Sequence, residues 1–261
     1  MEMNAVISLD LAASGIKLPA GRTLGESQLS SEYLKLIRPP ILGIQVDSSS
    51  TLADLTERGE FSLARMDGIA LEARAASPFL SPDLLRLSSA HTIYLENISA
   101  ALIRHTRPAE IRRTLTPVPA PAYTGIIIIA DTPLPVHGMK SAALASPCLF
   151  PKIWDTDMNL IYERNMLEAG KKMMVRYAPA ESIFTETPSG LSPEIAAFTG
   201  TKPMRIIARG LFGSLPTDPV IDTADALTII STEENRRLLH EGRVLIILAD
   251  STLKQPLETG D

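Results

Sequence analysis

The two side chains of this sequence that we consider first as candidates for catalysis are a histidine and a cysteine. His137 lies in the segment Leu-Pro-Val-His-Gly, and a loop histidine can exchange a proton near neutral pH. Catalysis by His137 would need a nucleophile or a carboxylate beside it in space. Cys148 is the only cysteine and has apolar neighbours, which favours burial as a small hydrophobic residue over a reactive thiol. We therefore expect no catalytic residue, and keep an enzyme or small-molecule-binding domain using His137 or Cys148 as the alternative.

Motifs that bind nucleotides, phosphates or metals are also missing from the sequence. It contains no GxGxxG, GxxxxGK[ST], HExxH, CxxC or GxSxG. The segment Gly138-Met-Lys-Ser141 ends like a phosphate-binding loop but lacks the earlier glycine. Asp155 to Asn159 begins like a calcium loop, yet Leu160 replaces its glycine and Met166 its closing glutamate. We expect polar turns at both places, no metal site and no cofactor.

Composition and charge narrow the class of protein. A length of 261 residues allows one large domain or two small ones, and 45% hydrophobic residues can form a sizeable core. The net charge of −5 argues against a nucleic-acid-binding protein, which needs clustered Lys and Arg. No run of residues reaches the ~18 apolar positions of a membrane span, and the first residues do not have the pattern of a secretory signal. We expect no nucleic-acid partner and no membrane span.

Residues 1–115 are predicted to form an N-terminal half of mixed helices and strands. The predicted order is a strand at 5–11, a helix at 21–38, a strand at 41–46, and helices that begin after Ser50 and Ser81. The strand at 5–11 has alternating apolar and polar side chains, which is typical of a half-buried strand. Pro39 and Pro40 are expected to end the long helix. His91 to Arg104 fits a strand or a helix, and we favour a strand at its beginning.

A proline-rich boundary at 116–122 is predicted to separate this half from a second one at 123–250. Ile126–Ile129 and Leu245–Leu248 are uninterrupted apolar runs, which predicts central strands of one sheet, covered on both faces. Ser231 and Glu234 form the pattern of a helix capping box, and residues 251–261 are expected to be a tail. The fold class that follows is α+β, with mixed sheets packed by short helices in two sub-domains.

The second half resembles a known family in the order of several short segments. These are Tyr123-Thr-Gly-Ile-Ile-Ile-Ile-Ala-Asp131, Ala145-Ser-Pro-Cys-Leu-Phe-Pro-Lys-Ile-Trp-Asp155, Met158-Asn-Leu-Ile-Tyr162, Lys202-Pro-Met-Arg-Ile-Ile-Ala208 and Thr217-Asp-Pro-Val-Ile221. In this order they resemble the strands of FlgP-like proteins over about residues 123–250. Members of that family are envelope lipoproteins linked to assembly or bracing of the flagellar motor.

The resemblance implies a non-enzymatic structural protein of the bacterial cell envelope, at the periplasm or the outer-membrane periphery. The expected partners are further copies of the same chain and other flagellar or envelope proteins. The sequence departs from the family in having neither the signal nor the lipid-bearing cysteine near residue 1. The predicted strand at 5–11 gives a physical route to self-association, because it could pair with the sheet edge of an adjacent copy. Pairing within its own domain is the alternative.

Overall fold

The computed structural model describes residues 2–115, 118–183, 190–253 and 257–258, so the predicted boundary lies partly outside the described residues. The chain forms two compact units. Unit 1 comprises Met1–Ile44, Thr51–Ile98 and Pro256–Asp261, and unit 2 comprises Gln45–Ser50 and Ser99–Gln255. The division in space therefore differs from the predicted division along the sequence. Residues 45–50 and 99–115 belong to unit 2, and the predicted tail contributes to unit 1.

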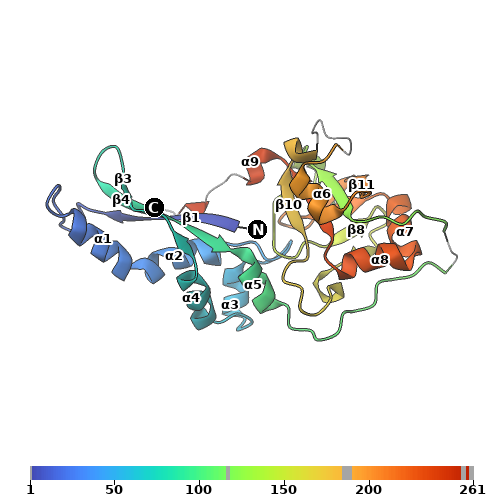
Figure 1. The fold of residues 1–261 in the computed structure, drawn as a ribbon, viewed down its shortest axis with the longest axis horizontal. Helices are drawn as coiled ribbons and strands as arrows, with labels where there is room; N and C mark the ends of the chain where they lie inside the picture. Colours follow the sequence, from blue (N-terminus) through green and yellow to red (C-terminus); the bar gives the residue numbers. More distant parts are fainter. Residues whose placement is uncertain (1, 116–117, 184–189, 254–256, 259–261) are drawn as a thin grey trace. The chain divides into compact units, whose positions relative to one another are not determined.

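Unit 1 has a sheet built on two nine-residue strands, β1 (Glu2–Asp10) and β4 (Arg86–Tyr94). They pair antiparallel over their whole length. The sheet order is β15-β1-β4-β2, with β3 also paired to β4. The short strands are β2 (Arg74–Ala75), β3 (Phe79–Leu80) and β15 (Leu257–Glu258). Helices α1 (Arg22–Ser31) and α2 (Tyr33–Leu42) lie along one side of β1 and β4 (Figure 1).

The alternation predicted for residues 5–11 is confirmed in β1. Ala5, Ile7 and Leu9 are buried, while Val6 and Ser8 on the opposite side are only partly buried. This difference arises because α1 and α2 pack on one face of the sheet, and successive side chains of a strand point to opposite faces. The strand pairs within its own unit, as in the alternative considered above.

The helical region that precedes residue 45 differs from the prediction. It consists of two helices, and α2 continues through Pro39 and Pro40 to Leu42, so no strand begins at residue 41. A proline inside a helix removes a hydrogen bond. Here Ile37 and Ile41, one turn apart, are completely buried, and this burial outweighs the lost bond. Helices α3 (Leu52–Glu57) and α4 (Leu63–Leu71) complete the helical layer.

The predicted helix after Ser81 is absent, because this segment is the turn of the β3–β4 hairpin. The Ser81 amide donates to the Arg86 carbonyl and the Ser81 hydroxyl accepts from the Arg86 amide. Leu84 has φ of +61°, a left-handed conformation that does not continue a helix. Strand β4 then ends at Tyr94 and α5 (Leu95–Leu102) follows at once, so residues 91–104 contain both a strand and a helix.

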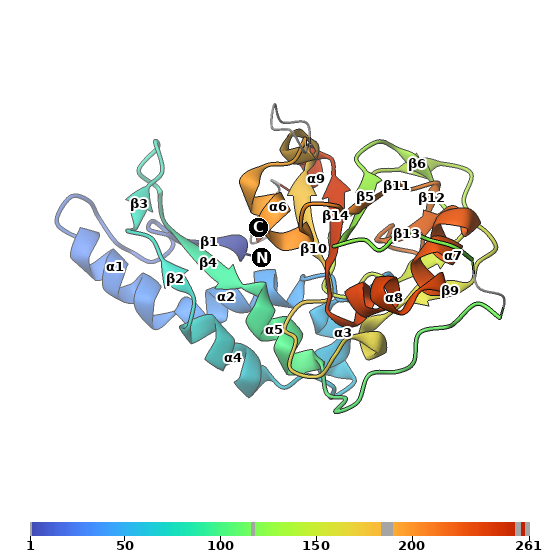
Figure 2. The same cartoon turned by 45° about the vertical axis from the view of Figure 1, so that its right-hand side comes forward.

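Unit 2 contains a four-stranded parallel sheet in the order β10-β14-β5-β11. Its strands are β5 (Ile126–Ala130), β10 (Arg176–Pro179), β11 (Met204–Ile207) and β14 (Val244–Leu248), which Figure 2 shows beside one another. The prediction that the runs at 126–129 and 245–248 are central strands of one sheet is confirmed. Nearly all their side chains are buried, and helix α6 (Pro193–Thr199) covers one face through Ile195.

A second sheet of unit 2 has the order β12-β13-β8-β9. Its strands are β8 (Ile153–Asp155), β9 (Leu160–Tyr162), β12 (Gly210–Phe212) and β13 (Asp218–Ile221). Unit 2 also contains a small hairpin of β6 (Leu134–Pro135) and β7 (Ala142–Ala143) and two 3-10 turns, η1 (Arg164–Met166) and η2 (Ala180–Ile183). Its remaining helices are α7 (Thr223–Ser231), α8 (Glu233–His240) and α9 (Asp250–Leu253). Both units mix helices with sheets, so the predicted α+β class is confirmed.

Two details near the end of unit 2 correct the prediction. Ser231 is the last residue of α7, and Thr232 caps α8 by accepting from the Asn235 amide. The predicted tail includes α9 and also β15, which pairs with β1.

The longest helices among the described residues have ten residues, about 15 Å. None of those helices is long and apolar enough to cross a bilayer.

Candidate functional site

Several polar and titratable side chains of unit 2 lie around Asp218, the first residue of β13. Asp218 is completely buried. Its Oδ1 accepts hydrogen bonds from the Lys152 amide at 3.0 Å and from the Thr217 hydroxyl at 3.0 Å. Its Oδ2 accepts from the Trp154 indole N–H at 3.4 Å. The two donors at 152 and 154 come from β8 and the residue before it, so the carboxylate links two parallel strands of the second sheet.

Cys148 and Tyr177 form the adjoining part of this buried network. The Tyr177 hydroxyl donates to the Cys148 carbonyl at 3.0 Å and accepts from the Cys148 amide at 3.2 Å. The thiol of Cys148 is 4% exposed. Tyr177 belongs to β10 of the parallel sheet, so this pair of hydrogen bonds joins the parallel sheet to the irregular segment before β8.

Burial controls the protonation of these groups. It raises the pKa of the Cys148 thiol far above its ordinary value, and raises the pKa of the Tyr177 hydroxyl as well. It also raises the pKa of the Asp218 carboxyl, although hydrogen bonds from Ser48, Lys152 and Thr217 oppose the rise. A protonated, covered thiol is a poor nucleophile. The network therefore fits a structural role, and we call Cys148, Tyr177, Thr217 and Asp218 the buried polar network.

Residues 45–50 join unit 2 at the edge of this network. The Gln45 and Val46 carbonyls accept from the Leu149 and Phe150 amides, at 3.0 and 2.8 Å. The Ser48 carbonyl accepts from the Leu215 amide at 3.0 Å. These bonds hold the irregular segment 144–152, which precedes β8.

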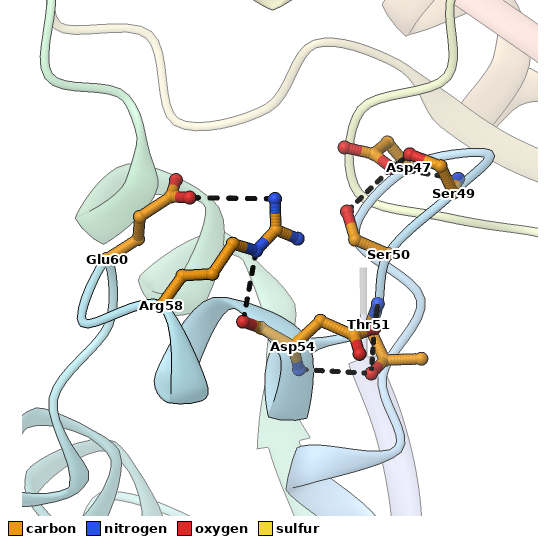
Figure 3. Close-up of polar contacts among 7 residues, drawn as sticks. All are labelled: Asp47, Ser49, Ser50, Thr51, Asp54, Arg58 and Glu60. Carbon is orange, nitrogen blue, oxygen red and sulfur yellow. Dashed lines mark hydrogen bonds and ion pairs between the residues drawn. The ribbon is translucent and has the colours of Figure 1, made fainter.

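The Asp47-Ser-Ser-Ser50 segment is a hydrogen-bonded turn, drawn in Figure 3. Asp47 Oδ1 accepts from the Ser49 amide and from the hydroxyls of Ser49 and Ser50. Burial would raise the pKa of Asp47, but these hydrogen bonds outweigh it and the pKa lies below its ordinary value. The predicted cap at Ser50 is displaced by one residue. Thr51 and Asp54 form the capping box of α3.

His137 lies apart from any described acid or base partner. Its side chain is exposed in the turn after β6, and its ring centroid is 5.8 Å from that of Phe212. Among the described residues, no hydrogen bond or ion pair joins its imidazole to a hydroxyl or a carboxylate. The structure thus does not bring His137 and Cys148 into one catalytic arrangement.

The two segments that resembled ligand-binding loops are turns. Gly138 has φ of +79° and lies in the tight turn between β6 and β7. The Asp155 carboxylate accepts from the amides of Asp157 and Asn159 and from the Asn159 side-chain amide. These bonds use the oxygens that a calcium ion would need. Within the described part of the chain, no group of three or more His, Cys, Asp and Glu residues is placed to hold a metal ion.

Sequence reasoning did not single out Asp218 or His91, the two buried titratable residues with the most unusual surroundings. His91 is 7% exposed in β4, and its two ring nitrogens have no hydrogen-bond partner among the described residues. Its ring centroid is 4.6 Å from that of Tyr33. The only available signal for Asp218 was its place between Thr217 and Pro219 at the start of an apolar run.

Comparison with known protein families gives a match for each half of the chain. Residues 1–101 match the family model of the N-terminal domain of Treponema pallidum Tp0624. Residues 125–251 match the model of the second domain of the same protein. No curated protein matches the chain. The two matches occur in the order of the domains in Tp0624, and neither is to FlgP-like proteins.

Proposed function

We propose that this chain, similar to the N-terminal and second domains of Treponema pallidum Tp0624, is a non-enzymatic assembly protein of the bacterial cell envelope. The proposal is supported by the burial and the hydrogen bonding of the buried polar network. Cys148 and Asp218 are buried, and the Tyr177 hydroxyl and the Asp218 carboxylate are used in hydrogen bonds to neighbouring segments of unit 2. Side chains used in this way stabilise a fold and are poorly suited to turn over a substrate.

The turn between β3 and β4 supports a role in binding other proteins. Phe79, Leu84 and Leu85 are 50, 56 and 52% exposed, and all belong to one hairpin. The turn is fixed by hydrogen bonds, including one from the Leu85 amide to the Asp83 carboxylate at 3.0 Å. Several large apolar side chains exposed on one hairpin favour an interaction site. We call these three side chains the hairpin tip.

The finer identity, a component that associates with the flagellar motor at the periplasm or the outer-membrane periphery, rests on the resemblance of residues 123–250 to FlgP-like proteins. In this proposal the chain associates with itself and contacts other envelope proteins.

Cell fractionation and cryo-electron tomography of the source organism test this proposal. We expect the protein in the envelope fraction, and we expect cells without its gene to lose density at the motor. A cytoplasmic protein with unchanged motors in the deletion strain would contradict the proposal.

A matched pair of variants tests the contribution of the hairpin tip. Replacing Phe79, Leu84 and Leu85 by serine should reduce the envelope proteins that co-purify with the chain. Replacing Leu24 and Leu71, exposed residues of α1 and α4, should have no such effect. Equal losses in both variants would show that the tip has no special role.

A further inference from the structure

The sheet edge formed by β1 is occupied by a segment that follows unit 2 in the chain. β15 pairs in parallel with β1, with Leu257 opposite Ala5 and Glu258 opposite Val6. On its other side, β1 pairs with β4 at all nine positions. Among the described residues, β15 therefore covers only two of the nine positions along this edge. A strand added at a sheet edge is held by main-chain hydrogen bonds, which the same segment of another copy can supply equally well.

The main chain of β1 is oriented to accept a strand at this edge. The Leu11 amide donates to the carbonyl of Leu85, the residue that precedes β4. In an antiparallel pair the direction of the main-chain groups alternates with each residue. Asn4, Val6 and Ser8 accordingly direct their N–H and C=O groups toward the side on which β15 lies.

We propose that the β1 edge accepts residues 257–258 of a second copy of this chain, which links copies by exchange of β15. Residues 257–258 of another copy are a suitable partner for this edge, because the same segment already pairs with it within one chain. An identical register is open to a neighbouring copy, and exchange of identical elements is a common route to oligomers. β1 belongs to the first part of the chain and β15 to the last, so each copy offers one acceptor and one donor.

This arrangement predicts the kind of assembly as well as its contact. Reciprocal exchange between two copies gives a closed dimer, whereas exchange in one direction gives a head-to-tail contact, which closes into larger rings or extends into filaments. The inference rests on the self-association in the proposed function and supplies its molecular contact. Pairing within a chain competes through its high effective concentration, so exchange should increase with protein concentration.

Two variants of the full chain, each with one added cysteine, distinguish exchange from pairing within one chain. Val6→Cys and Glu258→Cys place thiols on two residues in register, at the spacing of adjacent strands, which suits a disulfide. The native Cys148 is buried and does not compete. The two variants, one carrying a tag, are mixed at high micromolar concentration and oxidised. We expect a disulfide between tagged and untagged chains, in at least tenfold excess over a control mixture of Ala13→Cys with Glu258→Cys.

The double variant Val6→Cys/Glu258→Cys provides the second measurement. With exchange, it should give disulfide-linked dimers and larger species whose share rises with concentration. Only intrachain disulfides at every concentration, with no cross-linking in the mixture, would overturn the proposal. No disulfide in either experiment would overturn it too, because the pairing itself would be absent. Light scattering separates this failure from that of the proposed function, since self-association without a cross-link would leave the function intact.

Discussion

The two units bury their sheets in different ways. In unit 2, the central strands β5 and β14 are buried on both faces, as is usual for parallel sheets. In unit 1, helices cover one face of a sheet whose two long strands are antiparallel, and the opposite face carries polar side chains, such as Ser8 and Ser88, whose hydroxyls are 2.9 Å apart. The tolerance of a strand to substitution should therefore depend on the face in unit 1 and hardly at all in unit 2.

The units also differ in how their buried titratable groups are compensated. Asp218 of unit 2 has hydrogen-bond donors on both carboxylate oxygens. The buried imidazole of His91 in unit 1 has a tyrosine ring beside it and no hydrogen bond among the described residues. Hydrogen bonds offset part of the cost of burying Asp218, whereas no such bond offsets the burial of His91, and the shifted pKa of each group makes the stability of its unit depend on pH. The four predictions that follow test these differences, and hydrogen exchange can report on each unit separately.

The largest effect is expected for a charge in the core of unit 2. Ile128→Asp should lower the free energy of unfolding of unit 2 by about 3–5 kcal/mol, because it buries an unpaired carboxylate. Asn4→Asp in β1 is the matched control, since Asn4 is exposed on the polar face of its sheet and an aspartate keeps the acceptor for the Thr92 hydroxyl, and should change the stability of unit 1 by under about 0.5 kcal/mol. Denaturant unfolding measures both. Similar losses in the two variants would refute the contrast between the sheets.

The next effect concerns the buried polar network. Asp218→Ala should destabilise unit 2 by about 2–3 kcal/mol, because the buried Thr217 hydroxyl and the partly buried Lys152 amide and Trp154 indole lose their acceptor. Asp157→Ala is the control, a turn residue that accepts a single side-chain hydrogen bond from Thr223 in an exposed setting. A stable Asp218→Ala protein would mean that the network does not support the fold.

A smaller effect, which depends on pH, is expected at His91. Burial lowers the pKa of this imidazole below its ordinary value of 6.5, so the unfolded chain binds a proton more readily than the folded one. The stability of unit 1 should thus be fully present above pH 6.5 and decrease as the pH falls below it, by at most about 1.4 kcal/mol per pH unit. The pKa of Tyr33, the neighbouring titratable group, is raised by burial, so it stays neutral in this range.

His91→Phe tests the assignment of this pH dependence. The variant should flatten the decrease in unit 1 between pH 6.5 and 5 and leave the pH dependence of unit 2 unchanged. An unaltered slope would show that another group causes the effect.

Sequence reasoning succeeded where one local pattern decides the structure. Three main strands were identified from the apolar runs at 126–129 and 245–248 and from the alternation at 5–11. Burial on both faces of a strand gives an uninterrupted apolar run, and burial on one face gives alternating apolar and polar residues. It failed where the partner of a residue lies outside the short pattern that contains it. Ser81-Pro82 has the pattern of a helix start, but Arg86 binds Ser81 across a hairpin. The network around Asp218 joins positions 148, 177 and 218, and no short motif encodes that proximity.

The smallest effect is expected at two residues with left-handed backbone, one in each unit. Leu84 has φ of +61° and Met158 has φ of +60°, a conformation in which residues with a Cβ are strained but asparagine is tolerated. Leu84→Asn should stabilise unit 1, and Met158→Asn should stabilise unit 2, each by about 0.5–1 kcal/mol. Leu85→Asn is the control for the first, because Leu85 is equally exposed and its φ is not positive. Since the strain is local, each gain should be confined to the unit that carries the substitution.

If Leu84→Asn stabilises unit 1 and also weakens co-purification of envelope proteins, the strained leucine serves binding at the hairpin tip. Met158 belongs to the Asp155 turn and should show the gain in stability without any loss of binding. Equal stabilities for the leucine and asparagine forms at position 84 would show that the turn carries no strain.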